Sequence, residues 1–170
     1  MRQTIAAILS ILALAATTPA AGQQSGTSCD ISAYVIDQDA AGLNVRAGPS
    51  AAAPVLRVVS NQGSGVVRIR EQRGAWFRVS AIVDAENNED LFRADGWIHA
   101  SRVTLSVANA DPRLYARPHP QSRALARLVP EDSVVTLIGC AGHWAKIRAA
   151  GREGWLSPDG QCSNPLTTCA

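Results

Sequence analysis

The sequence lacks the short motifs that mark the common classes of enzyme. It contains no H-E-x-x-H, no G-x-S-x-G, no phosphate-binding glycine loop and no paired spacing of metal ligands. Its three histidines, His99, His119 and His143, are scattered along the chain, so they form no metal-binding pattern. The sequence therefore predicts no cofactor, no metal and no catalytic residue.

Lysine is almost absent, and the overall charge is nearly balanced. Lys146 is the only lysine, and 16 basic residues stand against 14 acidic ones. Nucleic-acid binding requires a basic stripe. The arginines between residues 68 and 78 instead alternate with apolar residues, as on the solvated outer face of strands. We therefore expect no nucleic-acid partner.

Long apolar runs are also missing, except for one at the N-terminus. Arg2 precedes an apolar run at residues 5–16, and small residues follow it. This order is typical of a secretory signal peptide, here residues 1–22, and the run is too short to span a bilayer comfortably. We expect a periplasmic or secreted protein with no stable membrane insertion after signal cleavage.

Four cysteines follow the signal segment: Cys29, Cys140, Cys162 and Cys169. An even number of cysteines in an exported chain favours disulfides, and four cysteines allow three pairings. We favour Cys140 with Cys162, because both flank the last expected strands, which leaves Cys29 with Cys169. A local bridge between Cys162 and Cys169 is the competing pairing.

What the chain does contain is an internal duplication. Each copy has an arginine, a turn, Trp-x-x-aliphatic and Gly-Trp-aliphatic, in this order. The offsets are 71 residues between Arg46 and Arg117, 68 between Trp76 and Trp144, and 58 between Trp97 and Trp155. The fall from 68 to 58 leaves about ten extra residues in the first copy, which we interpret as a polar inserted loop.

Alternation of apolar and polar residues, with frequent turns, predicts strands along the whole chain after the signal segment. The expected strands of the first copy lie at 30–36, 43–46, 55–60, 66–71, 75–83 and 96–99, and a 3₁₀ turn follows at 100–102. The second copy repeats this layout. We expect turns at 61–65 and 130–133 and no strand in the tail at 161–170. No window predicts an amphipathic helix beyond the signal segment.

The first copy resembles the bacterial SH3-like domain family, which forms small β-barrels in exported proteins. The resemblance rests on LNVRAGPS (with Arg46, Gly48 and Pro49), on Trp76 and Val79, and on Gly96, Trp97 and Ile98. The second copy is similar but degenerate: Arg117, Trp144, Gly154 and Trp155 match, whereas Tyr115-Ala116 stands where the family usually has Asn-Val. The resemblance implies an all-β chain of two tandem small SH3-like β-barrels, preceded by a secretory signal peptide.

The expected boundaries follow from this resemblance. After the signal peptide at 1–22, we expect the first SH3-like domain at 29–105, with the inserted loop near 80–95. The second domain is expected at 106–164, followed by a tail at 165–170. Each barrel is expected to close around its own core, and Trp97 and Trp155, each fixed after a glycine, are expected in these cores.

The resemblance implies an exported, non-catalytic binding module for a cell-wall peptide, for peptidoglycan or for an envelope protein. Aromatic side chains that are half exposed can bind such ligands. Trp76 and Trp144 follow turns and are the main candidates, and Tyr115 and His99 are expected to line the same groove.

The alternative hypothesis is an envelope cysteine peptidase or amidase. Cys140 and His143 lie three residues apart, and Asp132 lies upstream. A cysteine, a histidine and an acid can form a nucleophilic set. Complete disulfide pairing would remove the nucleophile, so the state of the Cys140 thiol separates the two hypotheses.

Overall fold

The computed structural model describes residues 25–37, 39–60, 64–108, 111–129, 135–164 and 166. Within these ranges the regular elements are β-strands and two 3₁₀ turns, η1 (Ala100–Arg102) and η2 (Pro158–Gly160). The predicted all-β fold is confirmed, and η1 is the 3₁₀ turn expected after the strand at 96–99. No helix in the described ranges is long and apolar enough to cross a membrane. The expected signal peptide lies outside these ranges.

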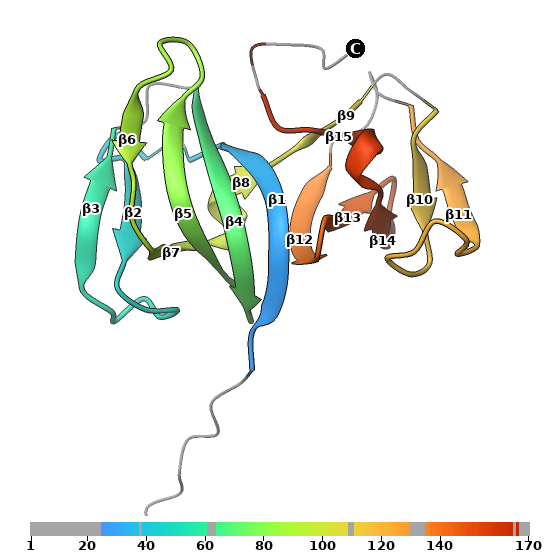
Figure 1. Ribbon diagram of the computed structural model, residues 1–170, viewed down its shortest axis with the longest axis horizontal. Helices are drawn as coiled ribbons and strands as arrows, with labels where there is room; N and C mark the ends of the chain where they lie inside the picture. The colour runs from blue at the N-terminus through green and yellow to red at the C-terminus, as the bar shows by residue number, and fades with distance from the viewer. Residues whose placement is uncertain are drawn as a thin grey trace, which may run out of the picture.

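The first barrel is built on one antiparallel sheet (Figure 1). Its strands are β1 (Thr27–Val35), β2 (Leu43–Arg46), β3 (Val55–Val59), β4 (Gly65–Arg73), β5 (Trp76–Asp84), β6 (Asp90–Phe92), β7 (Gly96–His99) and β8 (Val103–Thr104). They are ordered β3-β2-β7-β5-β4-β1-β8, and β6 pairs with β5.

The second barrel has a smaller antiparallel sheet in the order β11-β10-β14-β13-β12. Its strands are β10 (Arg113–Tyr115), β11 (Ala124–Arg127), β12 (Thr136–Ala141), β13 (Trp144–Ala149) and β14 (Arg152–Leu156). A separate two-stranded sheet pairs β9 (Ser106–Val107) with β15 (Gln161–Cys162). This pairing brings the strand after η2 back to the segment between the two barrels.

Period-two alternation places the cores. In β5, Phe77 and Val79 are fully buried and Trp76 and Arg78 point outward, because successive side chains of a strand lie on opposite faces. In the second barrel, large aliphatic side chains fill the interior, and Ile147 of β13 is one of them. The fully buried aliphatic residues there are Leu114, Leu137, Ile147 and Leu156.

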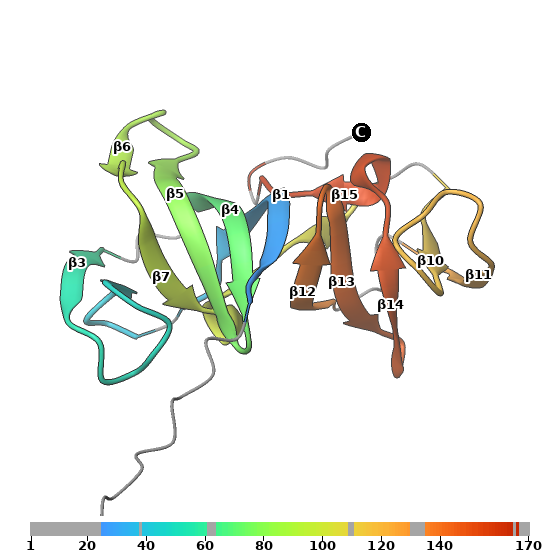
Figure 2. The ribbon, with the colours of Figure 1, turned by 60° about the horizontal axis from the view of Figure 1, so that its bottom comes forward.

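The two barrels pack against each other through β1 and β12, which lie side by side (Figures 1 and 2). The backbone of β1 pairs with the hairpin loop of the second barrel: Asp30 N–H donates to Gly142 O at 2.7 Å, and Gly142 N–H donates to Ser28 O at 2.9 Å. Thr104 Oγ1 donates to Val135 O at 2.9 Å across the same contact.

The buried apolar side chains of both barrels form a single contiguous cluster. The expectation of two separate cores is therefore wrong, although two SH3-like sheets are present as predicted. The physical reason is β1: it adds a strand to the first sheet and also packs on the second, so Cys29 and Cys140 are both buried at the contact.

Two further expectations differ from the structure. The residues near 80–95 form a β-hairpin extension rather than a polar loop, since β5 continues to Asp84 and β6 returns beside it, pairing Ile82 with Phe92. The tail contains the short strand β15, which pairs with β9. The turns expected at 61–65 and 130–133 fall largely outside the described residues.

Candidate functional site

Trp76 begins β5 directly after a tight hairpin. Gly74 adopts φ +54°, a left-handed conformation that suits glycine and lets the chain reverse between Arg73 and Trp76. Because Phe77 points into the barrel, the Trp76 side chain lies on the outer surface, where it is half-buried. This is the exposure that the turn before it predicts.

His99, the last residue of β7, lies beside Trp76. The two residues are paired across β5 and β7, and their rings meet edge to face, with centroids 5.1 Å apart and an interplanar angle of 88°. His99 Nδ1 lies 2.8 Å from Ser101 Oγ and accepts from Ser101 N–H at 3.4 Å, so the ring caps η1. The start of η1 therefore fixes the ring that faces Trp76.

A buried carboxylate also lies at this site. Asp37 is only 5% exposed. Its Oδ1 accepts from Arg102 Nη1 at 2.6 Å and from Asp39 N–H at 3.1 Å. A charge-assisted bond of this kind offsets part of the cost of burying a carboxylate. It also ties the segment after β1 to the end of η1.

Arg46 closes the site at the end of β2. Its Nη1 donates to Ala53 O at 2.8 Å, and the neighbouring Ala47 N–H donates to Pro54 O at 2.9 Å. The loop that contains Gly48 and Pro49 is thereby held against the strand. The Arg46 guanidinium therefore has two roles. It binds the loop backbone at Ala53, and it lines the site.

These groups border a hollow of about 350 Å³, which we call the Trp76 groove. Its lining residues are Asp37, Asp39, Leu43, Asn44, Arg46, Ala51, Trp76, His99, Ser101 and Arg102. Two predicted ligand contacts, Trp76 and His99, therefore lie in one site. Asp37 and Arg102 could not be identified from the sequence, because only the fold brings the segment after β1 next to η1.

The other two predicted contacts meet in the second barrel. The rings of Tyr115 and Trp144 are also edge to face, with centroids 5.5 Å apart and an interplanar angle of 88°. Trp144 begins β13 after Gly142, whose φ is +55°, so its local setting repeats that of Trp76. The four predicted residues therefore do not line a single groove. They form two separate pairs of rings, one in each barrel.

Backbone hydrogen bonds establish the register of the duplication. Ala47 N–H donates to Pro54 O in the first copy, and Ala116 N–H donates to Arg123 O in the second. The offset between the loops is therefore 69 residues (116 − 47 = 69). Both copies also have a register shift at the same place in the strand before the loop.

This register corrects one predicted equivalence. Tyr115, not Arg117, takes the place of Arg46, since each follows the residue that packs against the glycine of the Gly-Trp pair. Arg117 takes the place of Gly48 in the loop, where it is exposed. The two arginines look equivalent in the sequence because each copy has a Leu-x-x-Arg motif.

The tryptophans that follow glycine do not enter the core. Gly96 and Gly154 face inward, and a Cβ at these positions would lie 2.3 Å from Val45 Cγ1 and 2.5 Å from Leu114 Cγ, respectively. The next residue in each strand must then point outward. Trp97 is buried, as predicted, although on the outer face of its sheet, whereas the core prediction for Trp155 is wrong. Trp155 is half-buried on the outer face of its sheet.

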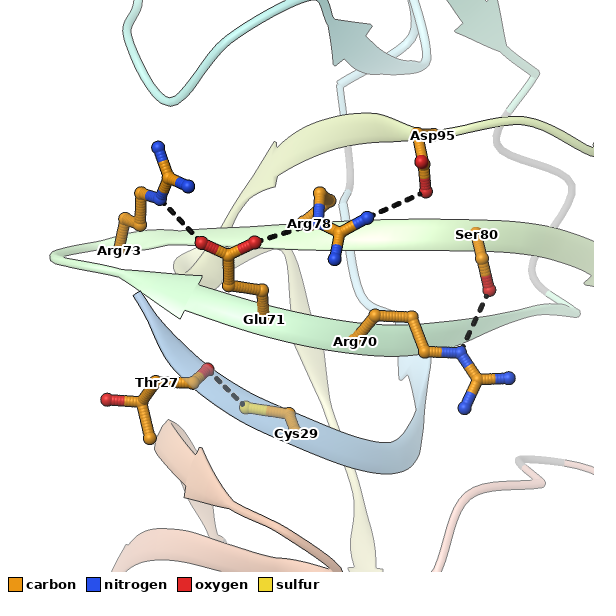
Figure 3. A network of polar contacts seen from close by, with 8 residues as sticks. All are labelled: Thr27, Cys29, Arg70, Glu71, Arg73, Arg78, Ser80 and Asp95. Carbon is orange, nitrogen blue, oxygen red and sulfur yellow. Dashed lines mark hydrogen bonds and ion pairs between the residues drawn. The ribbon is translucent and has the colours of Figure 1, made fainter. Parts of the chain in front are cut away.

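Trp97 is nevertheless only 6% exposed on the outer face of the first barrel. The Arg73 guanidinium lies over its ring at 5.3 Å from the centroid. Figure 3 shows the polar network to which Arg73 belongs, in which Glu71 accepts from Arg73 and Arg78. Burial alone would raise the pKa of Glu71, but the hydrogen bonds from Arg73 and Arg78 outweigh it and lower that pKa.

The disulfide joins Cys29 to Cys140, with their Cα atoms 5.6 Å apart. Both favoured pairings, Cys140 with Cys162 and Cys29 with Cys169, are therefore wrong. The reason lies in the packing of β1 against β12, which the pattern within each repeat does not reveal. Cys162 is not a free thiol, and Cys169 lies outside the described residues.

Cys140 therefore holds no thiol for the cysteine-peptidase hypothesis. His143 lies in the exposed hairpin loop, where its Nδ1 is 3.1 Å from Asp30 O and 3.5 Å from Asp30 Oδ2. Asp132, the acid of that hypothesis, lies outside the described residues. The described residues contain no cluster of three or more potential metal ligands among histidine, cysteine, aspartate and glutamate.

Two family models match the chain, and each describes a bacterial SH3 domain. One matches residues 41–104 and the other residues 111–158, so the matches fall on the first and second barrels. No curated protein matches the chain. The strand β1, which forms much of the contact between the barrels, lies before the first matched range. The chain thus belongs to the bacterial SH3 domain family and carries two copies of the domain in tandem.

Proposed function

We propose that this protein is an exported, non-catalytic binding module that recognises a cell-wall peptide, as part of peptidoglycan, through the Trp76 groove. Bacterial SH3 domains are commonly cell-wall-binding modules, and both barrels belong to this family. The disulfide between Cys29 and Cys140 supports an oxidising compartment, which the periplasm and the cell exterior provide.

The composition of the Trp76 groove carries the proposal. Its lining combines the half-buried rings of Trp76 and His99 with charged groups of both signs, among them the Asp37–Arg102 pair. A short peptide stem has both apolar side chains and charged groups, so it can contact the rings and the charged groups at once. The volume of about 350 Å³ suits a few peptide residues rather than a folded partner.

The groove is also rigid before any ligand arrives. The hydrogen bonds of His99 to Ser101, Arg46 to Ala53 and Asp37 to Arg102 hold its walls to β7, β2 and η1. Preorganisation of this kind favours affinity because little conformational entropy is lost on binding. The Tyr115–Trp144 pair is the proposed second contact, in the barrel that lacks the charged wall supplied by the segment after β1.

Isothermal titration calorimetry with a soluble muropeptide tests the proposal. We expect saturable binding by the native protein and a loss of about tenfold or more in affinity for Trp76→Ala, since a buried aromatic contact is worth over 1 kcal/mol. Trp144→Ala is the matched variant, with an expected loss of about threefold or less. Circular dichroism confirms that each variant is folded.

Absence of heat at millimolar muropeptide, with the protein folded, would exclude the wall-peptide proposal. An envelope protein partner would then be the surviving candidate for the groove. Equal losses of affinity for Trp76→Ala and Trp144→Ala would show that both barrels contact the ligand, and would contradict a site confined to the first barrel.

A further inference from the structure

A second hollow lies at the other end of β5 from the Trp76 groove. It has a volume of about 330 Å³, and we call it the Arg68 hollow. Its lining residues are Arg68, Arg70, Ser80, Ala81, Val83, Asn88, Asp90 and Arg93. They come from β4, β5 and the hairpin extension of the first barrel, and no lining residue is shared with the Trp76 groove.

Three arginines converge on this hollow, and their partners leave a positive charge. Arg70 pairs with Asp30, and Arg93 pairs with Asp90 through Nε–Oδ2 and Nη2–Oδ1 bonds of 2.6 Å each. The Arg68 side chain is exposed and has no hydrogen-bond or ion-pair partner in the described part of the chain. Carboxylates therefore neutralise the charges of Arg70 and Arg93 at the hollow, and the positive charge of Arg68 is left over.

The two paired arginines keep donors to spare. A guanidinium has five N–H donors in a rigid fork. Arg70 uses Nε toward Ser80 Oγ at 3.2 Å and Nη1 toward Asp30, and Arg93 uses Nε and Nη2 toward Asp90. The remaining N–H groups stay available. Asp30 and Asp90 thus orient the two guanidiniums and leave some of their N–H donors unoccupied.

The hairpin extension that supplies one wall of the hollow is firmly built. Asp84 Oδ1 accepts from Ser64 Oγ at 2.6 Å and from Glu86 N–H at 2.8 Å, and Asp84 N–H donates to Glu89 O at 2.8 Å. These bonds hold the tip, where Asn88 adopts φ +56°. The extension therefore presents Asn88, and Arg93 beyond it, in a defined position.

The second barrel lacks the counterparts of Arg68 and Arg70 and the hairpin extension. With the offset of 68 residues between Trp76 and Trp144, Thr136 stands in place of Arg68 and Ile138 in place of Arg70, and the equivalent pairs Ile69–Val79 and Leu137–Ile147 support this register. The hairpin extension has no counterpart there, because β13 passes directly into β14. A sound SH3-like sheet therefore forms without these groups, so folding does not require them.

We propose that the Arg68 hollow binds a phosphate group. Forked guanidinium donors match the oxygens of a tetrahedral oxyanion, and arginine is less strongly hydrated than lysine, which makes it the better phosphate ligand at a partly open site. The uncompensated charge of Arg68 attracts the anion, while Arg70, Arg93 and the Asn88 amide donate to it. The phosphate can belong to a lipid headgroup or to a soluble ion, and the hollow recognises their shared chemistry.

Calorimetric titration with inorganic phosphate at constant ionic strength tests this proposal. We expect saturable binding to the native protein and about a tenfold weakening for Arg68→Gln or Arg93→Gln. Arg148→Gln is the control, since it removes one exposed arginine from the outer face of the second barrel. It should leave the affinity within about twofold of the native value. Trp76→Ala should also keep it, because the Trp76 groove is a separate site.

Co-sedimentation with vesicles identifies the source of the phosphate. Retention on phosphatidylglycerol vesicles but not on phosphatidylcholine vesicles, lost in Arg68→Gln, supports a lipid headgroup. Binding of inorganic phosphate without vesicle retention supports a soluble phosphate. Failure of the native protein to bind either probe overturns the proposal, and so does an equal weakening by Arg68→Gln and Arg148→Gln. Neither failure affects the peptide proposal, whose probe and site are different.

Discussion

The side-chain amide of Gln72, in the first barrel, accepts a hydrogen bond at Oε1 from the backbone N–H of Cys140, in the second, at 3.1 Å. Its Nε2 donates to Ile138 O at 3.1 Å. The strand β12 has a register shift between Leu137 and Gly139, and a Cβ at Gly139 would lie 2.6 Å from Gln72 Oε1. One side chain of β4 therefore replaces a strand partner for this part of β12.

Replacement of Gln72 tests this connection. Gln72→Ala leaves Cys140 N–H and Ile138 O without their partner at a half-buried contact, which we expect to lower the free energy of unfolding by about 1–3 kcal/mol. Urea denaturation measures the change. Gln121→Ala, in an exposed loop of the second barrel, is the control and should stay within about 0.5 kcal/mol. A similar small effect for Gln72→Ala would contradict the role of this amide.

The disulfide should make a large contribution to stability. It closes a separation of 111 residues, and a loop of this length restricts the unfolded chain by about 3–5 kcal/mol. We expect the double variant Cys29→Ser, Cys140→Ser to lose an amount of that order in urea denaturation. Peptide mapping of the unreduced protein checks the pairing directly. A peptide that joins Cys140 to Cys162 would contradict the structure.

Acid should weaken the fold through Glu71. The pKa of this carboxyl in the folded chain lies below its ordinary value of 4.5. The unfolded chain therefore binds the proton more readily, so the stabilisation is present above pH 4.5 and is lost as the pH falls through the folded pKa. The pKa shifts in the same direction at Asp84, Asp90, Asp111 and Glu153.

Variants at two glutamates isolate this effect. Glu71→Gln should be less stable than the native protein at pH 7 and should lose less stability on acidification, as measured by urea denaturation at pH 7 and pH 3.5. Glu89→Gln, in the exposed hairpin tip, should reproduce the pH dependence of the native protein. If Glu71→Gln retains the full native pH dependence, the ion pairs of Glu71 with Arg73 and Arg78 do not contribute to the loss of stability in acid.

Two glycines with different environments should respond differently to alanine. A Cβ at Gly96 would lie 2.3 Å from Val45 Cγ1, whereas nothing lies within 4 Å of a Cβ at Gly74, whose φ is +54°. We expect Gly96→Ala to cost about 2–3 kcal/mol through overpacking. Gly74→Ala should cost about 1 kcal/mol through its backbone conformation alone. Thermal denaturation compares them, and a smaller loss for Gly96→Ala than for Gly74→Ala would refute the steric explanation.

The strands were predictable because they are local. Alternation along the residues of β1, β2, β4 and β5 identifies strands and their inward faces, and the glycine before each tryptophan strand marks a hairpin. The 3₁₀ turn at Ala100–Arg102 was predicted for the same reason. These features depend on neighbours in the chain, which the sequence displays directly.

Relations across the fold were not predictable in this way. The pairing of Cys29 with Cys140 depends on how β1 packs against β12. The equivalence of Arg46 with Tyr115 depends on which residue meets the inward glycine, not on the order of similar letters. Of the candidate site, Trp76 and His99 were identified from their types and positions, whereas Asp37 and Arg102 join the groove only after the sheet has formed.

Backbone chemical-shift mapping during a muropeptide titration tests the central claim most directly, because it locates the bound peptide without any substitution. Our account predicts that the largest shifts cluster on the residues that line the Trp76 groove, with Trp76, His99 and Asn44 among them, while residues of the Arg68 hollow stay unchanged. Binding with its largest shifts at any other surface, or no residue-specific shifts at saturating peptide, would contradict it.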